Sequence, residues 1–405
     1  MQQRVRFVRA QDEAETVVVA RQPILDHLER IVAFELLTPQ DEEDPRQATA
    51  GVLARSIADI GLTKLAGSRP VHVDVTREFL LAVRPLPFTP DRVILELAAD
   101  QRVDELLLHA LNEARDAGFQ IALDGFAGDR DDALLQLADS VKLNIASLDE
   151  EAIEHAVNVA RGRGLHLIAD GVQTREAYGF CRGLGFDAFQ GQYFAEPVVV
   201  HGASAPTYRL RALSMLAMNE STSFEQLERV ITEDPGLSFK LMKLANSAFF
   251  GGRHRVGSVR QALMTLGSVA VRRWATLLVL AGVNDRPSHL LELGLLRARL
   301  CELVASRTPG AEPERAFTVG LFSVVDALLG TRMHVLLDDL PFDERTSRAL
   351  GTHEGPEGSL LAGVLAYERG DFEDCADAGV SLVDIARAYG EALDWTDGAM
   401  VQLTA

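Results

Sequence analysis

The sequence predicts two domains, a compact α/β barrel followed by an all-helical domain. From residue 17 to about residue 200, short β-branched apolar runs alternate with amphipathic stretches, which is typical of parallel β/α units. Eight such runs favour a closed TIM-like barrel, although the pattern alone leaves a doubly wound sheet open. Beyond residue 207 the strand-like alternation stops and helical spacing takes over. A chain of 405 residues fits two domains of about 200 residues each.

The first half carries the predicted strands, each rich in Val, Ile, Leu or Phe. They are residues 17–20, 31–37, 71–75, 93–97, 120–123, 140–143, 165–169 and 187–189. Residues 102–117 illustrate the helical pattern between them, with apolar side chains at i, i+3 and i+4 spacing and Gly118 as a stop. We therefore place the barrel at residues 1–200.

The segment 201–207 breaks this rhythm with Gly, Ala, Ser and Pro, and we interpret it as a linker. A helical domain follows at residues 208–395, and residues 396–405 are expected to form a loose tail. The predicted helices of the domain 208–395 are residues 208–218, 223–232, 236–245, 259–266, 268–283, 289–307, 312–329 and 359–369.

Composition excludes several classes of protein. The hydrophobic fraction of 47% is that of an ordinary globular chain, so disorder does not explain any large part of it. A net charge of −19 argues against a general nucleic-acid binder, because the phosphate backbone would repel most of the surface. Three widely spaced cysteines fit neither a zinc site nor a disulfide framework. Without a long apolar segment or a signal peptide, we expect a cytoplasmic protein with no membrane span.

A charged side chain ends each of six successive strands. They are Glu35, Asp74, Glu96, Asp124, Lys142 and Asp170. One such residue would be an ordinary solvated loop residue, but six in succession are typical of a barrel that carries its chemistry at the C-terminal strand ends. If the barrel closes, five carboxylates converge on one mouth and form an oxygen-ligand site that suits Mg²⁺ or Mn²⁺.

These residues lie in runs with a specific order. The runs are Val-Ala-Phe-Glu-Leu-Leu at 32–37, Val-Asp-Val-Thr at 73–76, Leu-Glu-Leu at 95–97, Ala-Leu-Asp-Gly-Phe at 122–126, Val-Lys-Leu-Asn at 141–144, Ile-Ala-Asp-Gly-Val-Gln at 168–173 and Phe-Gln-Gly-Gln-Tyr-Phe-Ala-Glu-Pro at 189–197. The series resembles EAL-domain cyclic di-GMP phosphodiesterases over about residues 17–200. The resemblance implies the EAL fold and phosphodiester cleavage by two divalent cations. It assigns metal-binding roles to Glu35, Glu96 and Asp124, and places Lys142 near the attacking water.

The departures from the family pattern led us to expect an inactive barrel. Gly125 stands where the family has a second tandem Asp, and Pro39 stands where it has an Arg that grips substrate phosphate. Asp74 replaces a metal-binding Asn, and Asp170 replaces a Glu. Losing a bidentate Arg removes one of the stronger phosphate contacts that a protein can make.

We therefore expect a catalytically inactive regulatory protein that acts through protein contacts. In that hypothesis no catalytic residue is active, Glu35 and Lys142 are vestigial, and no metal or other cofactor is expected. The vestigial metal residues would be Glu35, Asp74, Glu96, Asp124 and Asp170. Two alternatives remain open, a cyclic di-GMP sensor and a weakly active phosphodiesterase that uses Mg²⁺ or Mn²⁺. The possible cyclic di-GMP contacts at the mouth are Glu35, Leu37, Asp74 and Gln190.

The second half contains two further recognisable runs, Ile-Thr-Glu-Asp-Pro-Gly-Leu-Ser-Phe-Lys-Leu-Met-Lys-Leu-Ala-Asn-Ser-Ala-Phe-Phe-Gly at 231–251 and Ser-Val-Arg-Gln-Ala-Leu-Met-Thr-Leu-Gly at 258–267. They resemble the HDOD domain, a helical relative of HD-type phosphohydrolases, over roughly residues 208–390. True HD enzymes bind metals through several histidines and a His-Asp pair. No His in this chain precedes an Asp, so the resemblance predicts neither a metal site nor hydrolase chemistry here.

The helical half also has a basic stretch. From residue 236 to 284 there is no Asp or Glu, in a chain of net charge −19. The seven basic residues are Lys240, Lys243, Arg253, Arg255, Arg260, Arg272 and Arg273. They predict either a docking surface for an acidic partner, such as another signalling protein or the chain's own barrel mouth, or an ordinary helix surface. The resemblance to EAL barrels also suggests a homodimer.

Overall fold

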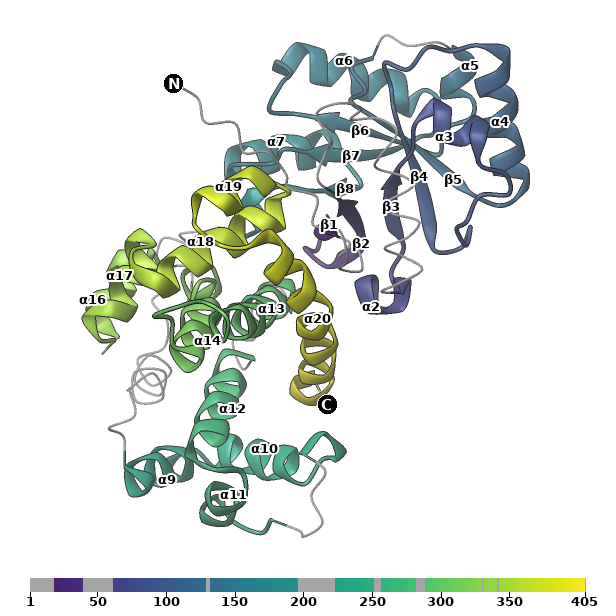
Figure 1. Cartoon of the computed structure of the whole chain (residues 1–405). Coiled ribbons are helices and arrows are strands. Elements are labelled where there is room, and N and C mark those ends of the chain that lie inside the picture. Colours follow the sequence, from purple (N-terminus) through teal and green to yellow (C-terminus); the bar gives the residue numbers. More distant parts are fainter. Residues whose placement is uncertain are drawn as a thin grey trace.

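The computed structural model describes residues 18–38, 61–128, 132–195, 223–250, 256–281, 288–329, 331–340 and 342–404. A closed barrel is followed by an array of helices that packs against its β1 side (Figure 1). The predicted fold class, an α/β barrel followed by an all-helical domain, is confirmed. The predicted helix 208–218 and linker 201–207 lie outside the described residues.

Eight strands close the barrel in sequence order, from β1 to β8 and back to β1. They are β1 (Ala20–Asp26), β2 (Ile31–Leu37), β3 (Val71–Asp74), β4 (Val93–Ala98), β5 (Gln120–Asp124), β6 (Ser140–Asn144), β7 (His166–Asp170) and β8 (Ala188–Phe189). Strands β2 to β8 run parallel, each paired with the next. The C-terminal ends of these strands therefore lie at one end of the barrel and form a single mouth, as predicted from the charged residues there.

Strand β1 runs against its neighbours, and here the predictions of a strand at 17–20 and of parallel units throughout were wrong. β1 pairs antiparallel with both β2 and β8. The connection to β2 is short and closed by Asp26, whose Oδ1 accepts hydrogen bonds from the backbone N–H groups of Leu28 and Arg30. A parallel crossover needs a dozen or more residues, so this chain must reverse as a hairpin. The first residues of β1 consequently lie beside the end of β2, at the mouth.

The barrel helices lie between successive strands. They are α2 (Leu62–Ala66), α3 (Arg77–Ala82), α4 (Glu105–Asp116), α5 (Asp132–Leu135), α6 (Glu150–Arg161) and α7 (Arg175–Leu184), followed by the short η1 (Gln192–Ala195). Thr76, Asp104, Asp149 and Thr174 each accept a backbone N–H of the first turn through the side chain. The α4 stripe around Leu107 and Leu111 packs against the outside of the sheet, as its spacing predicted.

The described part of the second half is helical throughout. Its elements are α9 (Phe224–Glu233), α10 (Pro235–Ala245), η2 (Ala248–Phe250), α11 (Val259–Leu266), α12 (Ser268–Ala281), α13 (Ser288–Ala305), α14 (Pro313–Phe322), α15 (Val325–Leu329), α16 (Met333–Asp339), α17 (Glu344–Thr352), α18 (Gly355–Arg369), α19 (Phe372–Asp377) and α20 (Leu382–Thr404). No helix in the described ranges is long and apolar enough to cross a membrane.

Two predictions in this half were wrong. The helix predicted at 312–329 is interrupted after Phe322, where the Ser323 hydroxyl turns back to bond the Gly320 carbonyl. The expected tail at 396–405 is helical as far as Thr404, because α20 buries Thr396 and Ala399 in the protein core. Residues 396–405 contain many polar side chains, but the apolar face of α20 packs against other helices, including α13.

The two halves share one hydrophobic core. A single cluster of buried side chains includes residues from β1 to β8 and from α9 to α20. Helix α13 packs against α14, α18 and α20, while α18 packs against β1 and α20 against α2. Figure 1 shows α18, α19 and α20 lying next to the β1–β2 hairpin. The helical domain therefore takes part in covering this side of the barrel.

The close packing of α13 against α14 can be tested by substitution at Gly320. A Cβ added at Gly320 would lie 2.5 Å from the carbonyl oxygen of Arg297, so Gly320→Ala must push the helices apart. We expect it to cost about 1–3 kcal/mol and to lower the melting temperature in calorimetry. Gly179, on the exposed side of α7, has open space around its Cβ position. Gly179→Ala should instead keep or raise the melting temperature, and equal destabilisation by both variants would contradict this packing.

Candidate functional site

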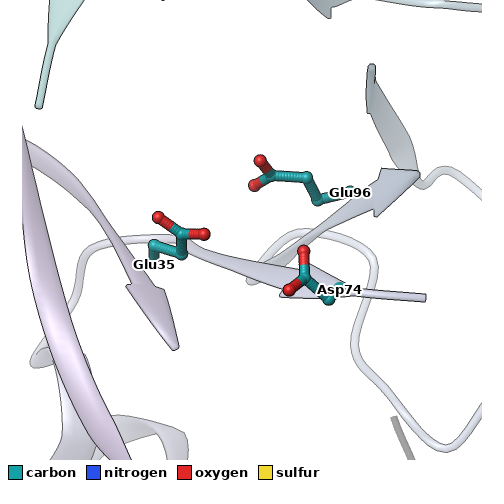
Figure 2. A group of neighbouring side chains, drawn as sticks. All are labelled: Glu35, Asp74 and Glu96. Carbon is teal, nitrogen blue, oxygen red and sulfur yellow. The ribbon is translucent and has the colours of Figure 1, made fainter. Parts of the chain in front are cut away.

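Three carboxylates meet at the barrel mouth. Glu35, Asp74 and Glu96 lie at or near the C-terminal ends of three neighbouring strands, and one oxygen of each lies within 4.8 Å of the others (Figure 2). In Figure 2 their carboxylate groups point toward one shared space. Such a set of oxygen atoms is what Mg²⁺ and Mn²⁺ prefer. The residues that sequence analysis considered vestigial are therefore in a geometry that can hold a divalent cation.

Lys142 supplies the positive charge of this cluster. It comes from β6, is 2% exposed, and its Nζ lies 2.8 Å from Glu35 Oε2 and 2.8 Å from Glu96 Oε1. Burial alone would lower its pKa, but the surrounding carboxylates outweigh burial and raise the pKa of Lys142 well above its usual value. The ammonium therefore stays charged and ties two strands together across the mouth.

A histidine that the sequence analysis missed holds the other oxygen of Glu96. His72 Nδ1 lies 3.0 Å from Glu96 Oε2, and both side chains are almost fully buried. Burial opposes the ionised form of Glu96, but Lys142 and His72 together lower the pKa of Glu96 to about 2. His72 precedes Asp74 by two residues, so strand alternation puts both on the same face. That parity was visible in the sequence, but the contact with Glu96 depends on the barrel.

Gln190 and Gln22 complete the network around Glu35. Gln190 donates from Nε2 to Glu35 Oε2 and to Gln22 Oε1, the second at 2.6 Å. Gln22 lies opposite Glu35 in the β1–β2 register. Among the described residues, the buried Gln190 Oε1 has no hydrogen-bond partner. The predicted mouth residue Gln190 thus lies beside Glu35, whereas sequence analysis missed Gln22 because the hairpin that places it was not foreseen.

Three carboxyl groups at the mouth, those of Asp74, Asp124 and Asp170, have raised pKa values. Burial, reinforced by the charges of Glu96 and Glu35, raises the pKa of Asp124 to about 6. Burial and the same neighbours raise the pKa of Asp74 well above its usual value, and burial also raises that of Asp170. Crowded acids of this kind ionise more readily when a cation binds among them. The donor set therefore fits a divalent metal.

The positions that departed from the family pattern look different in three dimensions. Gly125 is exposed, has a positive φ of 69°, and its Cβ position faces open space. It offers no ligand atom, but Asp74 brings a carboxylate where the family has an amide. The mouth consequently keeps five carboxylates. Leu37 is half-buried at the end of β2, whereas Pro39 lies outside the described residues.

The predicted basic surface is partly neutralised within the helical domain. Arg260 binds Glu228, with 2.6 Å between Nη2 and Oε2, and Arg273 binds Glu302 at 2.7 Å. Lys240 and Lys243 lie exposed on α10, and Arg272 is half-buried on α12. Arg253 and Arg255 lie outside the described residues. A docking role for this set stays a prediction.

The Lys142 clamp leads to a stability prediction. Lys142→Met leaves Glu35 and Glu96 without a cation, and breaking a buried pair in this way costs about 3–5 kcal/mol. We expect a lower melting temperature without metal and a larger rise on adding Mn²⁺ than in the unsubstituted protein. Arg84→Met, which breaks an exposed pair with Glu113, should change little. A Lys142→Met protein as stable as the original would show that the clamp does not hold the mouth.

Comparison with known proteins agrees with this architecture. The model of the EAL domain matches residues 71–197, and the model of the HDOD domain matches residues 204–333. The protein YuxH of Bacillus subtilis is 28% identical over 405 residues, covering 95% of this chain and 99% of its own. Cyclic di-GMP phosphodiesterase CdgJ of Vibrio cholerae is 27% identical over 404 residues, covering 95% and 94%.

Two solved structures are similar to part of this chain. A cyclic di-GMP complex of Klebsiella pneumoniae BlrP1 with calcium is 20% identical, covering 43% of this chain and 54% of that one, with a TM-score of 0.37. A cyclic di-GMP complex of the PaMucR phosphodiesterase is 20% identical, covering 44% and 94%, with a TM-score of 0.38.

The expectation of a catalytically inactive, non-enzymatic protein was wrong. A relative that matches 95% of the chain is a cyclic di-GMP phosphodiesterase, and three of the residues taken as vestigial form the cluster of Figure 2. Gly125 offers no ligand atom, but Asp74 supplies a carboxylate to the cluster. The recognition of the two domains, by contrast, is confirmed. The chain carries an EAL domain in its barrel and an HDOD domain in its helical half.

Proposed function

We propose that this protein is a metal-dependent cyclic di-GMP phosphodiesterase that acts at the mouth of its barrel. The observation that carries the proposal is the oxygen cluster of Glu35, Asp74 and Glu96, with ligand atoms within 4.8 Å of one another. The relative CdgJ, named a cyclic di-GMP phosphodiesterase, supports this assignment because its similarity extends over 95% of the chain.

In this proposal Glu35, Asp74 and Glu96 hold the metal, with Asp124 and Asp170 beside them. A bound Mg²⁺ or Mn²⁺ would polarise the phosphodiester and lower the pKa of a coordinated water. Lys142 and His72 fix the direction of the Glu96 oxygens, and Gln190 fixes Glu35. These contacts preorganise the carboxylates, so little rearrangement is needed when the cation enters.

The chain's own groups supply the remaining chemistry. Lys142 remains an ammonium, so it can stabilise negative charge that develops on the phosphate oxygens. Burial and its acidic neighbours raise the pKa of Asp124 to about 6 before a metal binds, so this carboxyl is ionised near neutral pH and can act as a general base. We propose that the Asp124 carboxylate accepts the proton of the attacking water.

The mouth also offers contacts for the rest of the ligand. Leu37, half-buried at the end of β2, presents apolar surface to a guanine ring. The unpaired Oε1 of Gln190 is an acceptor that lies beside Glu35. We propose Glu35, Leu37, Asp74 and Gln190 as the cyclic di-GMP contacts of the described residues. A sensor that binds without hydrolysis is the second candidate, since Gly125 carries no ligand atom.

Turnover is the direct test of this proposal. The full chain incubated with cyclic di-GMP and Mn²⁺ or Mg²⁺ should yield the linear dinucleotide, measured by chromatography. Glu35→Gln should lower the rate by about a hundredfold or more, because it removes an anionic ligand. Glu113→Gln, an exposed carboxylate on α4, is the matched control and should leave the rate unchanged. Saturable binding without any turnover would instead favour the sensor.

The pKa of Asp124 predicts how metal binding depends on pH. Below a pKa of about 6 this carboxyl is protonated, and the proton competes with the cation. Mn²⁺ affinity measured by calorimetry should therefore rise from about pH 5.5 to about pH 8, with proton release on binding. Asp124→Asn should reduce this dependence, and Asp74, whose pKa is also raised well above its usual value, should keep part of it. An affinity that is constant over the same range in the unsubstituted protein would contradict the assignment.

A further inference from the structure

We propose that Glu292, on helix α13 of the HDOD domain, is a positioning residue for the barrel mouth. Through Arg21 it fixes strand β1, and β1 in turn carries the Gln22 side chain that holds Gln190 against Glu35. The inference rests on the proposed function in so far as Glu35 is a metal ligand.

The contact between the domains is a buried ion pair. Arg21 Nη2 lies 3.0 Å from Glu292 Oε1, and the two side chains are only 5% and 11% exposed. Arg21 also donates from Nη1 to the Leu65 carbonyl at 2.6 Å, and its guanidinium lies 4.2 Å from the centre of the Phe34 ring. The planar guanidinium is therefore held from several directions, which fixes its orientation more tightly than a single ion pair could.

This clamp lies one residue away from the mouth network. Consecutive side chains of a strand point to opposite faces, so Arg21 points out of the barrel while Gln22 points in. In the hairpin register Arg21 is opposite Leu36, and Gln22 is opposite Glu35. Gln190 bonds both Gln22 and Glu35 through the same nitrogen atom. A displacement of β1 at Arg21 must therefore displace the Gln22 side chain too.

The first half of β1 depends on the helical domain for support. Strand β1 pairs with β8 only at Leu25 and Asp26, at the end of the strand that is far from the mouth. Near the mouth, β1 has β2 on one side, and the helical domain contacts it through Tyr367, whose hydroxyl donates to the Val19 carbonyl at 2.6 Å. The turn after α18 also reaches the rim, where a Cβ on Gly370 would lie 3.0 Å from Leu37 Cδ1.

Helix α13 holds the hairpin at its other end as well. The two ring nitrogens of His289 lie 3.1 Å from the Glu29 carbonyl oxygen, in the β1–β2 turn, and 2.9 Å from that of Phe194. Glu292 follows His289 by three residues, so both are on the same side of the helix. One rigid helix thus contacts the hairpin at the turn and near the mouth, and a shift of α13 would be transmitted to both.

A second ion pair between the domains provides the control. Lys64 Nζ lies 2.6 Å from Asp394 Oδ2, but these side chains are 34% and 58% exposed and lie on α2 and α20. Asp394→Asn weakens the same interface without touching the ion pair on β1. Comparing it with Glu292→Gln separates a specific effect on the mouth from general loosening.

The experiment measures Mn²⁺ affinity of the full chain by calorimetry, with hydrogen exchange of residues 18–26 as a second readout. Glu292→Gln should weaken Mn²⁺ binding by about threefold or more and speed exchange in β1, while Asp394→Asn changes neither. Because Glu292→Gln leaves Arg21 buried without its partner, the double variant Arg21→Gln/Glu292→Gln, which removes both charges, guards against simple unfolding. It should remain folded and keep the weakened affinity.

Two results would overturn the inference. One is Mn²⁺ affinity and β1 exchange that are unchanged in both Glu292 variants, and the other is an equal effect of Asp394→Asn. Neither readout requires catalysis. If the unsubstituted chain binds Mn²⁺ but does not cleave cyclic di-GMP, the proposed hydrolysis fails while the role of Glu292 is still decided by these measurements.

Discussion

The placement of one ammonium group among five carboxylates is the constraint on which the barrel mouth depends. Lys142 Nζ contacts Glu35 and Glu96 at 2.8 Å each, in surroundings almost closed to water. Without it, the ionised carboxylates would repel one another where the dielectric screening is weak. Even with it, burial, reinforced by the charges of Glu96 and Glu35, raises the pKa of Asp74 well above its usual value and that of Asp124 to about 6. A site in this electrostatic state has a strong tendency to bind a divalent cation.

The same constraint links the chemistry to the domain arrangement. Glu35 Oε2 accepts from both Lys142 Nζ and Gln190 Nε2, and Gln190 also donates to Gln22 Oε1. Gln22 lies on the strand that reverses direction, and that strand is partly supported by helices from the second domain. The helical domain packs against the barrel at β1, and in our proposal a partner that moves α13 would act on the mouth through this strand. Such an arrangement is suited to coupling a protein contact to an enzyme, provided that both sites bias the same element.

Much of this could be predicted from the sequence, for physical reasons that also explain the failures. The parallel strands and the strand-end charges follow from local periodicity, and strands 31–37 and 93–97 were placed almost without error. The reversal of β1 was missed because apolar runs do not reveal strand direction. The partnership of His72 with Glu96 was missed because it depends on neighbouring strands. The expectation of an inactive barrel failed because the total charge and donor count of the mouth depend on residues from several strands, which no single motif shows.

The most direct test of the central claim is the position of a bound metal. A crystal of the full chain grown with Mn²⁺, measured at a wavelength where manganese scatters anomalously, should show a peak within coordination distance of Glu35, Asp74 and Glu96. Density for the metal at that point, with Lys142 still beside Glu35, is the predicted result. An anomalous map with no peak between these three carboxylates, at a Mn²⁺ concentration that saturates binding in solution, would contradict the account.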